Sequence, residues 1–300
     1  MSALASPAAM AQLYATATDA LYTIADQYFH LGRFKEAQSI LDTVLHLLAA
    51  QEVQPQQRIN PLLLKGAILI VEHLLTRSQT EPMFAPLQAA KQLAEVNQDQ
   101  QALADALSLL GQAHYFTTVV ARLQRAVSPD SLQEQGEYAD AFAYQQQALA
   151  IREDLQDQRG ISESFFQIGA IYERWRQQDQ AQTYYRKACQ IADQSDCRFE
   201  KTEPLRHMAL YAFRQGNLDQ ALTCASEALS LRQAAGFKPY LPLDHRLLSD
   251  IYQAKGNSAQ ALFHQQQAAT LADEMGFAPL IALVSTRSDR LPTPKVEAQA

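Results

Sequence analysis

Cysteine, glycine and proline are scarce in this chain of 300 residues, which contains 3 cysteines, 10 glycines and 12 prolines. Three irregularly spaced cysteines do not make a disulfide framework, so a reducing compartment and a cytoplasmic protein are expected. So few glycines and prolines argue against a β-rich or disordered chain. The hydrophobic content of 47% is sufficient for ordered helices.

Basic residues are also in the minority, because 25 lysines and arginines face 32 acidic residues and leave a net charge of −7. This balance disfavours a broad phosphate-binding surface, so no nucleic-acid partner is expected. Residues 1–12 have neither a basic start nor a continuous apolar core, and do not predict a secretory signal. The most apolar window, residues 61–71, is shorter than the roughly 20 residues that cross a membrane, so no membrane partner is expected.

Motifs that carry chemistry are absent from the sequence, which has no HExxH, glycine-rich phosphate loop, GxSxG or paired CxxC. The seven histidines are scattered, which favours surface or groove positions over a metal site. We therefore predict a protein that is not an enzyme, with no catalytic residues, no metal and no cofactor.

What the sequence does contain is a repeat of 40 residues between Gly136 and Asp273. Two alanine positions and one large apolar position recur in four copies: Ala141, Ala148 and Ile151; Ala181, Ala188 and Ile191; Ala221, Ala228 and Leu231; and Ala261, Ala268 and Leu271. A fixed period of this length predicts an array of similar units rather than one globular core.

Each unit predicts a pair of antiparallel helices. In the second copy, Ile168, Gly169 and Tyr172 follow helical spacing, a polar break follows at residues 176–179, and a second apolar stripe begins at Ala181. Two stripes of helical period separated by a short turn are typical of a helical hairpin.

Small residues and turn glycines support this interpretation. Ala181 and Ala221 would let neighbouring helices approach to about 8 Å. Gly216 and Gly256 lie where a first helix should end, and glycine accepts the positive φ that ends a helix tightly.

This pattern resembles the tetratricopeptide repeat family, whose unit has a Gly and a Tyr on the first helix and spaced alanines on the second. The matching residues are Ile168, Gly169, Tyr172, Ala181, Ala188, Gly216, Ala221 and Ala228. The unit is longer than the usual 34 residues, as in the family's longer-repeat members. The resemblance implies an all-α, right-handed superhelical solenoid of antiparallel helix pairs.

The solenoid is predicted to span residues 10–287 as a single domain of about six helix pairs, after a flexible N-terminus over residues 1–9. The interval between Gly111 and Gly136 is longer than in the other units and predicts an insertion near residues 117–135.

The sequence Gly-Phe-x-Pro occurs at residues 236–239 and again at 276–279. The second copy predicts a C-terminal capping helix over residues 279–287, because no partner helix follows it. Residues 288–300 contain two prolines and no apolar pattern, and predict a disordered tail.

The first helix is predicted over residues 10–31, packed on a partner helix over residues 34–51. Its apolar residues at helical spacing are expected to point inward: Leu13, Ala17, Ala20, Leu21, Ile24 and Tyr28.

In the family that this chain resembles, ligands bind the concave face, which the first helix of each unit lines. The resemblance therefore implies a partner-binding groove at first-helix positions outside the packing stripe: Phe166, Gln167, Glu173, Arg206, His207, Phe213, Arg246 and Asp250. Arg206 and Arg246 share one register, so they are expected roughly 10 Å apart on adjacent helices. They would suit a carboxylate-bearing peptide; the alternative is a solvated helix face with two ordinary arginines.

The leading hypothesis is a non-enzymatic scaffold or adaptor that binds a peptide or helix of another protein in the concave groove. The sequence also allows a homo-oligomer. The alternative is a ligand- or peptide-sensing regulatory module of a bacterial signalling or transcription system, in which a bound signal changes the curvature of the array.

Overall fold

The computed structural model describes residues 7–50, 55–124 and 135–285. Within these ranges the protein consists of thirteen α-helices and three short 3-10 helices, without any strand. The predicted all-α solenoid is therefore confirmed.

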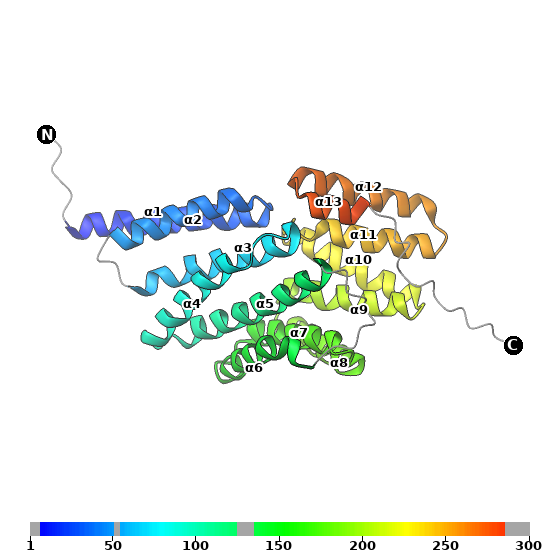
Figure 1. Ribbon diagram of the computed structural model, residues 1–300, viewed down its shortest axis with the longest axis horizontal. Helices are drawn as coiled ribbons and strands as arrows, with labels where there is room; N and C mark the ends of the chain where they lie inside the picture. The colour runs from blue at the N-terminus through cyan, green and yellow to red at the C-terminus, as the bar shows by residue number, and fades with distance from the viewer. Residues whose placement is uncertain (1–6, 51–54, 125–134, 286–300) are drawn as a thin grey trace.

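Six helix pairs follow one another along the chain (Figure 1). The pairs are α1 (Pro7–His30) with α2 (Phe34–Ala50), α3 (Ile59–Thr76) with α4 (Glu81–Val96), α5 (Gln100–Gln124) with α6 (Ala139–Asp154), α7 (Gln158–Arg174) with α8 (Gln178–Gln194), α9 (Thr202–Arg214) with α10 (Leu218–Ala234), and α11 (Leu241–Ala254) with α12 (Ser258–Met275). A single helix, α13 (Ala278–Ser285), follows the last pair. The 3-10 helices are η1 (Pro55–Arg58), η2 (Gln135–Tyr138) and η3 (Arg198–Lys201).

The two alanine registers lie in the contacts between helices, as predicted, and each of their alanines is at most 4% exposed. The third register differs, because Ile151 and its three equivalents are only partly buried. The residue after each of them is buried instead, and these residues are Arg152, Ala192, Arg232 and Ala272. The innermost position in the last turns of α6, α8, α10 and α12 therefore alternates between arginine and alanine.

Glycine ends the first helix of two units, as predicted. Gly216 and Gly256 both have a φ of 77°. The asparagines that follow, Asn217 and Asn257, cap the next helix, since each side chain accepts a hydrogen bond from the backbone N–H three residues on.

The N-terminal boundary differs from the prediction. Helix α1 begins at Pro7, so residues 7–9 are helical rather than part of a flexible segment, and residues 1–6 lie outside the described residues. Proline fits here because the first turn of a helix does not use its N–H groups.

In the region of the predicted insertion near residues 117–135, helix α5 continues to Gln124 and η2 begins at Gln135. Residues 125–134 are outside the described part of the chain, as is the predicted tail at residues 288–300. The helix at the position of the predicted cap spans Ala278–Ser285.

The buried face of α1 is not the predicted one. Leu13, Ala17, Ala20 and Ile24 are exposed, whereas Thr18 and Ala25 are the buried residues of this helix. The helical period was correct, but the helix is apolar over a wider sector than α2 and α3 cover.

The two ends of the array meet, as Figure 1 shows for α1 and α2 beside α12 and α13. Helix α13 packs on α3 as well as on α11 and α12. One buried apolar cluster joins Phe34 and Ile68 from the first two pairs to Ala272, Leu280 and Val284 from the end of the array. Helix α13 therefore covers the first units in addition to the last one.

The turn between α1 and α2 lies between the two Gly-Phe-x-Pro loops. The Phe237 ring meets the Phe29 ring edge-on at a centroid distance of 5.4 Å, and Phe277 stacks on Phe34 at 5.3 Å. The backbone N–H of Lys238 donates to the carbonyl of His30 at 2.8 Å. We call this junction, from the α1–α2 turn to the two loops, the seam.

Helix α3 is the most apolar long helix of the core. With η1 it makes a helical stretch, Gln56–Thr76, that by length and composition alone would be sufficient to cross a membrane. The expectation that this region is too short was therefore wrong about its length. Within the fold, 61% of its most apolar window is buried, and the core helix of a soluble protein meets the same criterion.

Candidate functional site

Helices α7 and α9 bring three of the predicted groove residues together around Tyr185 of α8. The Tyr185 hydroxyl donates to Glu173 Oε2 at 2.7 Å, and His207 Nδ1 lies 2.8 Å from the same oxygen. The Phe166 ring meets the His207 ring edge-on at 5.4 Å. Burial acts to raise the pKa of Glu173, but His207, the Tyr185 hydroxyl and Arg214 outweigh it and hold that pKa well below its usual value. Glu173 is therefore an anion at neutral pH.

The two predicted arginines have different surroundings. Arg206 Nη2 donates to Glu203 Oε2 at 2.8 Å, so Arg206 already has a carboxylate partner. Arg246 Nε lies 4.0 Å from Asp250 Oδ2, beyond hydrogen-bonding distance. Arg246 Nη1 is buried and has no hydrogen-bond partner within the described ranges. The side chains of Arg206 and Arg246 are 20% and 22% exposed.

Two of the eight predicted groove residues are core residues instead. Gln167 is 7% exposed and Phe213 is 8% exposed. Phe213 belongs to the apolar cluster that α9, α10 and α11 share. Helical spacing placed these residues beside the packing stripe, but the neighbouring helices reach far enough round to cover them.

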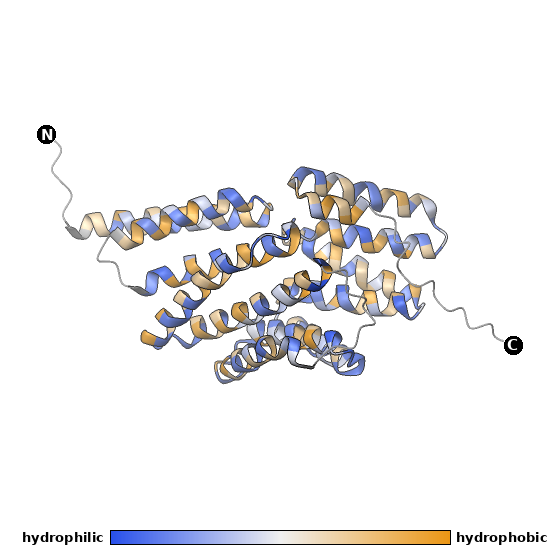
Figure 2. Cartoon of the chain, in the orientation of Figure 1, coloured by the Kyte–Doolittle hydropathy of each residue, from blue (hydrophilic) through white to orange (hydrophobic). Residues whose placement is uncertain are grey.

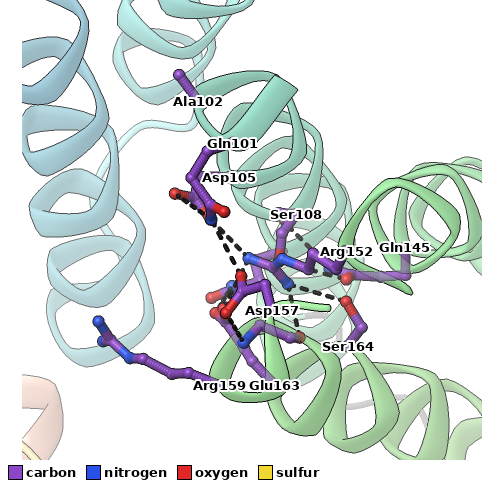
Figure 3. A network of polar contacts seen from close by, with 12 residues as sticks. Gln101, Ala102, Asp105, Ser108, Gln145, Arg152, Asp157, Arg159, Glu163 and Ser164 are labelled. Carbon is purple, nitrogen blue, oxygen red and sulfur yellow. Dashed lines mark hydrogen bonds and ion pairs between the residues drawn. The ribbon is translucent and has the colours of Figure 1, made fainter. Parts of the chain in front are cut away.

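A buried arginine, Arg152 of α6, bonds to residues of α5 and α7 (Figure 3). Its Nη2 donates to Asp105 Oδ1 of α5 at 2.9 Å and to Glu163 Oε2 of α7 at 3.0 Å. Its Nη1 donates to the Gly160 carbonyl at 3.1 Å and to Ser164 Oγ at 2.8 Å. The side chain of Arg152 is only 2% exposed, so these bonds fix how α5, α6 and α7 pack.

Arg232 repeats this arrangement 80 residues later, on α10. Its Nε lies 2.6 Å from Asp244 Oδ2 of α11, and its Nη2 lies 2.5 Å from Glu203 Oε1 of α9. Burial raises the pKa of Asp244, although Arg232 and Arg206 act to lower it. Sequence reasoning missed both arginines, and the available signal was that Arg152 and Arg232 share one phase of the 40-residue repeat.

A cavity of about 430 Å³ opens beside the Arg152 cluster. Tyr22, Leu63 and Leu109 form part of its apolar wall, and Asp105 and Glu163 form part of its polar wall. Figure 3 shows Arg159 directed away from Arg152. The Arg159 side chain is 74% exposed, and its Nε lies 2.5 Å from Glu200 Oε1. The cavity therefore combines apolar surface with charged groups of both signs.

The described residues contain no group of three or more histidine, cysteine or acidic side chains that could hold a metal ion. Burial raises the pKa of Cys189 to about 12, so this thiol stays protonated and acts as a packing residue.

Two histidines that the sequence places apart do meet, because α11 and α12 pack together. His245 and His264 are 5% and 8% exposed, and their Nδ1 atoms lie 2.9 Å apart. Tyr252 stacks on His264 at a centroid distance of 5.5 Å. One ring must donate and the other accept, so at least one of the two rings must be neutral, and burial opposes a charge on either ring.

The stability of the protein is expected to fall as the pH drops from about 6.5 toward 4, in part through this pair. Burial, with a smaller effect of His264, lowers the pKa of His245 to about 4, and burial lowers the pKa of His264. Between these pH values the two histidines bind protons in the unfolded chain but not in the folded pair, so lowering the pH favours unfolding. Thermal unfolding at about pH 7 and about pH 5 measures the loss. A variant with His245→Leu and His264→Phe should lose less stability than the parent between these two pH values. An equal loss would show that this histidine pair does not cause the effect.

The family model for the tetratricopeptide repeat matches residues 130–194 and 202–274. The matched residues are tetratricopeptide repeats. Arrays of this repeat are protein-interaction modules that present an extended concave surface. A comparison with curated proteins found no match.

Two solved structures resemble this tetratricopeptide-repeat protein. One is a Rap protein complexed with competence and sporulation factor, at 17% identity and a TM-score of 0.62, covering 87% of this chain and 65% of that one. The chain thus spans less than two thirds of that protein's length. The other is BtubC from P. vanneervenii, at 15% identity and a TM-score of 0.52, covering 82% of this chain and 92% of that one. Identities this low show a shared fold and no more.

Proposed function

We propose that this protein is a non-enzymatic cytoplasmic adaptor that binds an extended peptide segment of a partner protein along its concave face. The peptide presents a carboxylate to Arg246 of α11 and continues along α9 and α7, which carry His207 and Phe166. The observation that carries this proposal is the state of Arg246, a partly exposed guanidinium with a buried N–H that has no acceptor in the described structure.

A guanidinium in this state favours binding of an anion. An arginine N–H that is shielded from water and unpaired costs free energy. Rotation of the partly exposed Arg246 side chain toward a ligand carboxylate would recover this free energy with a charge-assisted hydrogen bond. Arg206 is less suited to this role, because its hydrogen bond to Glu203 already satisfies it. Glu173 is satisfied in the same way by Tyr185 and His207.

The test uses peptides selected from a random library against the folded full-length chain, with affinities measured by fluorescence polarisation. Arg246→Gln is expected to weaken the selected peptides by about 10- to 100-fold, since a hydrogen bond to a charged group contributes roughly 1.5–3 kcal/mol. Amidating the carboxyl groups of the peptide should weaken binding to the parent chain and change little for Arg246→Gln.

The matched control is Arg186→Gln on the exposed side of α8, where the side chain donates to Thr183 Oγ1 of the same helix. It should bind the peptides like the parent. Enrichment of no peptide, or equal binding by Arg246→Gln and the parent, would overturn the proposal. Circular dichroism of both variants verifies that they are folded.

The second candidate, a peptide-sensing regulatory module, is favoured by the seam. A ligand on the concave face contacts helices that the α1–α2 turn and the two Gly-Phe-x-Pro loops hold in a closed arrangement, so binding could change that closure. The similar Rap protein was crystallised in complex with competence and sporulation factor. X-ray scattering with a selected peptide separates the candidates, because an adaptor keeps its radius of gyration and a sensor changes it.

A further inference from the structure

Helix α1 carries a second apolar stripe that nothing in the described structure covers. Its large members are Met10, Leu13 and Ile24, which are 41%, 60% and 46% exposed, and Leu31, directly after the helix, is 42% exposed. Ala17 and Ala20 lie between them and are also exposed. Figure 2 shows hydrophobic residues recurring along this helix.

The spacing of the stripe is that of a coiled-coil seam. Positions 10, 13, 17, 20, 24, 27 and 31 alternate steps of three and four residues, and only position 27, a glutamine, is polar. This period keeps one face of a helix directed at a partner helix. From Met10 to Gln27 the stripe is about 26 Å long at 1.5 Å per residue. Single exposed apolar residues need no explanation, but a continuous stripe indicates an interface.

We propose that α1 pairs antiparallel with α1 of a second copy of this chain. In this register Leu13 packs against Ile24 of the second copy, and Ala17 packs against Ala20 of the second copy. Small side chains therefore meet at the two-fold axis, where the helices approach most closely, and large ones meet on both sides of it. In a two-fold interface the same surface patch of both copies must be complementary to itself. A stripe with small side chains at its centre and large ones on both sides meets this requirement.

Charge favours a second copy over a different helix. The charged residues of α1 are Asp19 and Asp26, and neither lies on the stripe. The flanking positions Tyr14, Thr16 and Leu21 are uncharged. Charged flanks are what select an unlike helix in a coiled coil, and α1 offers none. It also offers no like-charge contact that would oppose pairing with itself.

The shape of the molecule favours the antiparallel arrangement. The N-terminal end of α1 points away from the body, while its other end enters the seam (Figure 1). An antiparallel pair places the two bodies at opposite ends of the joined helices. A parallel pair would bring both bodies to the same end.

The first test is the mass of the full-length chain, 33.4 kDa as a monomer, by sedimentation equilibrium over a range of micromolar concentrations. The parent is expected to reach twice this mass. Leu13→Glu and Ile24→Glu are expected to raise the dimer dissociation constant by at least about tenfold, because each buries a charge in the interface. Both should keep the parent's thermal unfolding midpoint as monomers, since these positions are exposed in a single chain.

The matched control is Phe263→Glu on α12, where an apolar side chain 50% exposed lies outside the stripe. It should leave the dimer intact. A monomeric parent, a dimer that resists Leu13→Glu and Ile24→Glu, or equal weakening by Phe263→Glu would each overturn the proposal.

Disulfide cross-linking tests the register. Leu13→Cys mixed with Ile24→Cys should give a linked dimer under mild oxidation, whereas each variant alone should give no more than the parent. The parent's own cysteines lie on α8, on α10 and before η3, and define the background. Strong linking of Leu13→Cys to itself would show a parallel pair and would overturn the proposed arrangement.

Discussion

Replacing Arg232 with methionine is expected to lower the free energy of unfolding by about 3–5 kcal/mol. The guanidinium is 1% exposed and is the cation between Asp244 of α11 and Glu203 of α9. Methionine fills much of the volume but removes the charge. Arg206 still pairs with Glu203, so the penalty falls mainly on Asp244, whose side chain is 1% exposed. Chemical denaturation at neutral pH measures the loss.

The penalty should shrink as the pH falls from neutral. Burial raises the pKa of Asp244 even beside Arg232, and without this cation it rises further. In the variant, Asp244 is then protonated in the folded state at pH values where it is ionised in the unfolded chain. Lowering the pH therefore stabilises the variant relative to the parent. Arg186→Met, on an exposed face, should change stability by less than about 0.5 kcal/mol. A loss for Arg232→Met that is constant with pH would contradict a role for an unpaired Asp244.

Phe34→Ala is expected to cost about 3–5 kcal/mol and to loosen the closure of the array. Phe34 is 2% exposed, stacks on Phe277 and belongs to the cluster that joins the first units to the last. Its loss leaves a cavity where the two ends of the array meet. We expect both a lower denaturation midpoint and a larger radius of gyration by X-ray scattering under conditions in which the variant is folded.

Phe263→Ala supplies the comparison, because its ring is 50% exposed on α12, away from the seam. It should cost less than about 1 kcal/mol and leave the scattering profile unchanged. If Phe34→Ala were destabilised while keeping the parent's radius of gyration, the ring would be an ordinary core residue and not a closure element.

The repeat itself was predictable because small residues at a fixed spacing have few structural uses. Ala181 and Ala221 are needed wherever two helices approach closely, and both are fully buried. A turn glycine acts within a few residues of the chain, so the helix end at Gly216 was equally predictable. Rules that involve only residues close together in the chain were thus sufficient to predict the helix pairs.

The polar core was not predictable from the same rules. An arginine in the last turn of a helix usually reaches solvent, and Arg152 and Arg232 are buried only because carboxylates come to them from other helices. Asp105 is 47 residues from Arg152, and Asp244 is 12 residues from Arg232. Their pairing depends on how the units stack, which a single sequence does not specify.

The groove and the first helix show the same limit. The structure brings Phe166, Glu173 and His207 together, although helical spacing placed them only outside the packing stripe of their helices. Helical spacing could not decide how far adjacent helices cover a given face, so Phe213 was placed in the groove although it is buried, and Leu13 was placed inward although it is exposed. How much of a helix face is covered depends on the crossing angles and on which helices lie next to it, and not on the period of its apolar residues.

The seam also has a consequence for how the protein is made. In an open array each unit relies on its neighbours alone, so early units can complete their packing while later ones are still being translated. Here α2 and α3 share an apolar cluster with Leu280 and Val284, close to the other end of the described chain. During synthesis that apolar surface stays uncovered until α13 has left the ribosome, and a chain terminated before α13 would retain it as an aggregation-prone face.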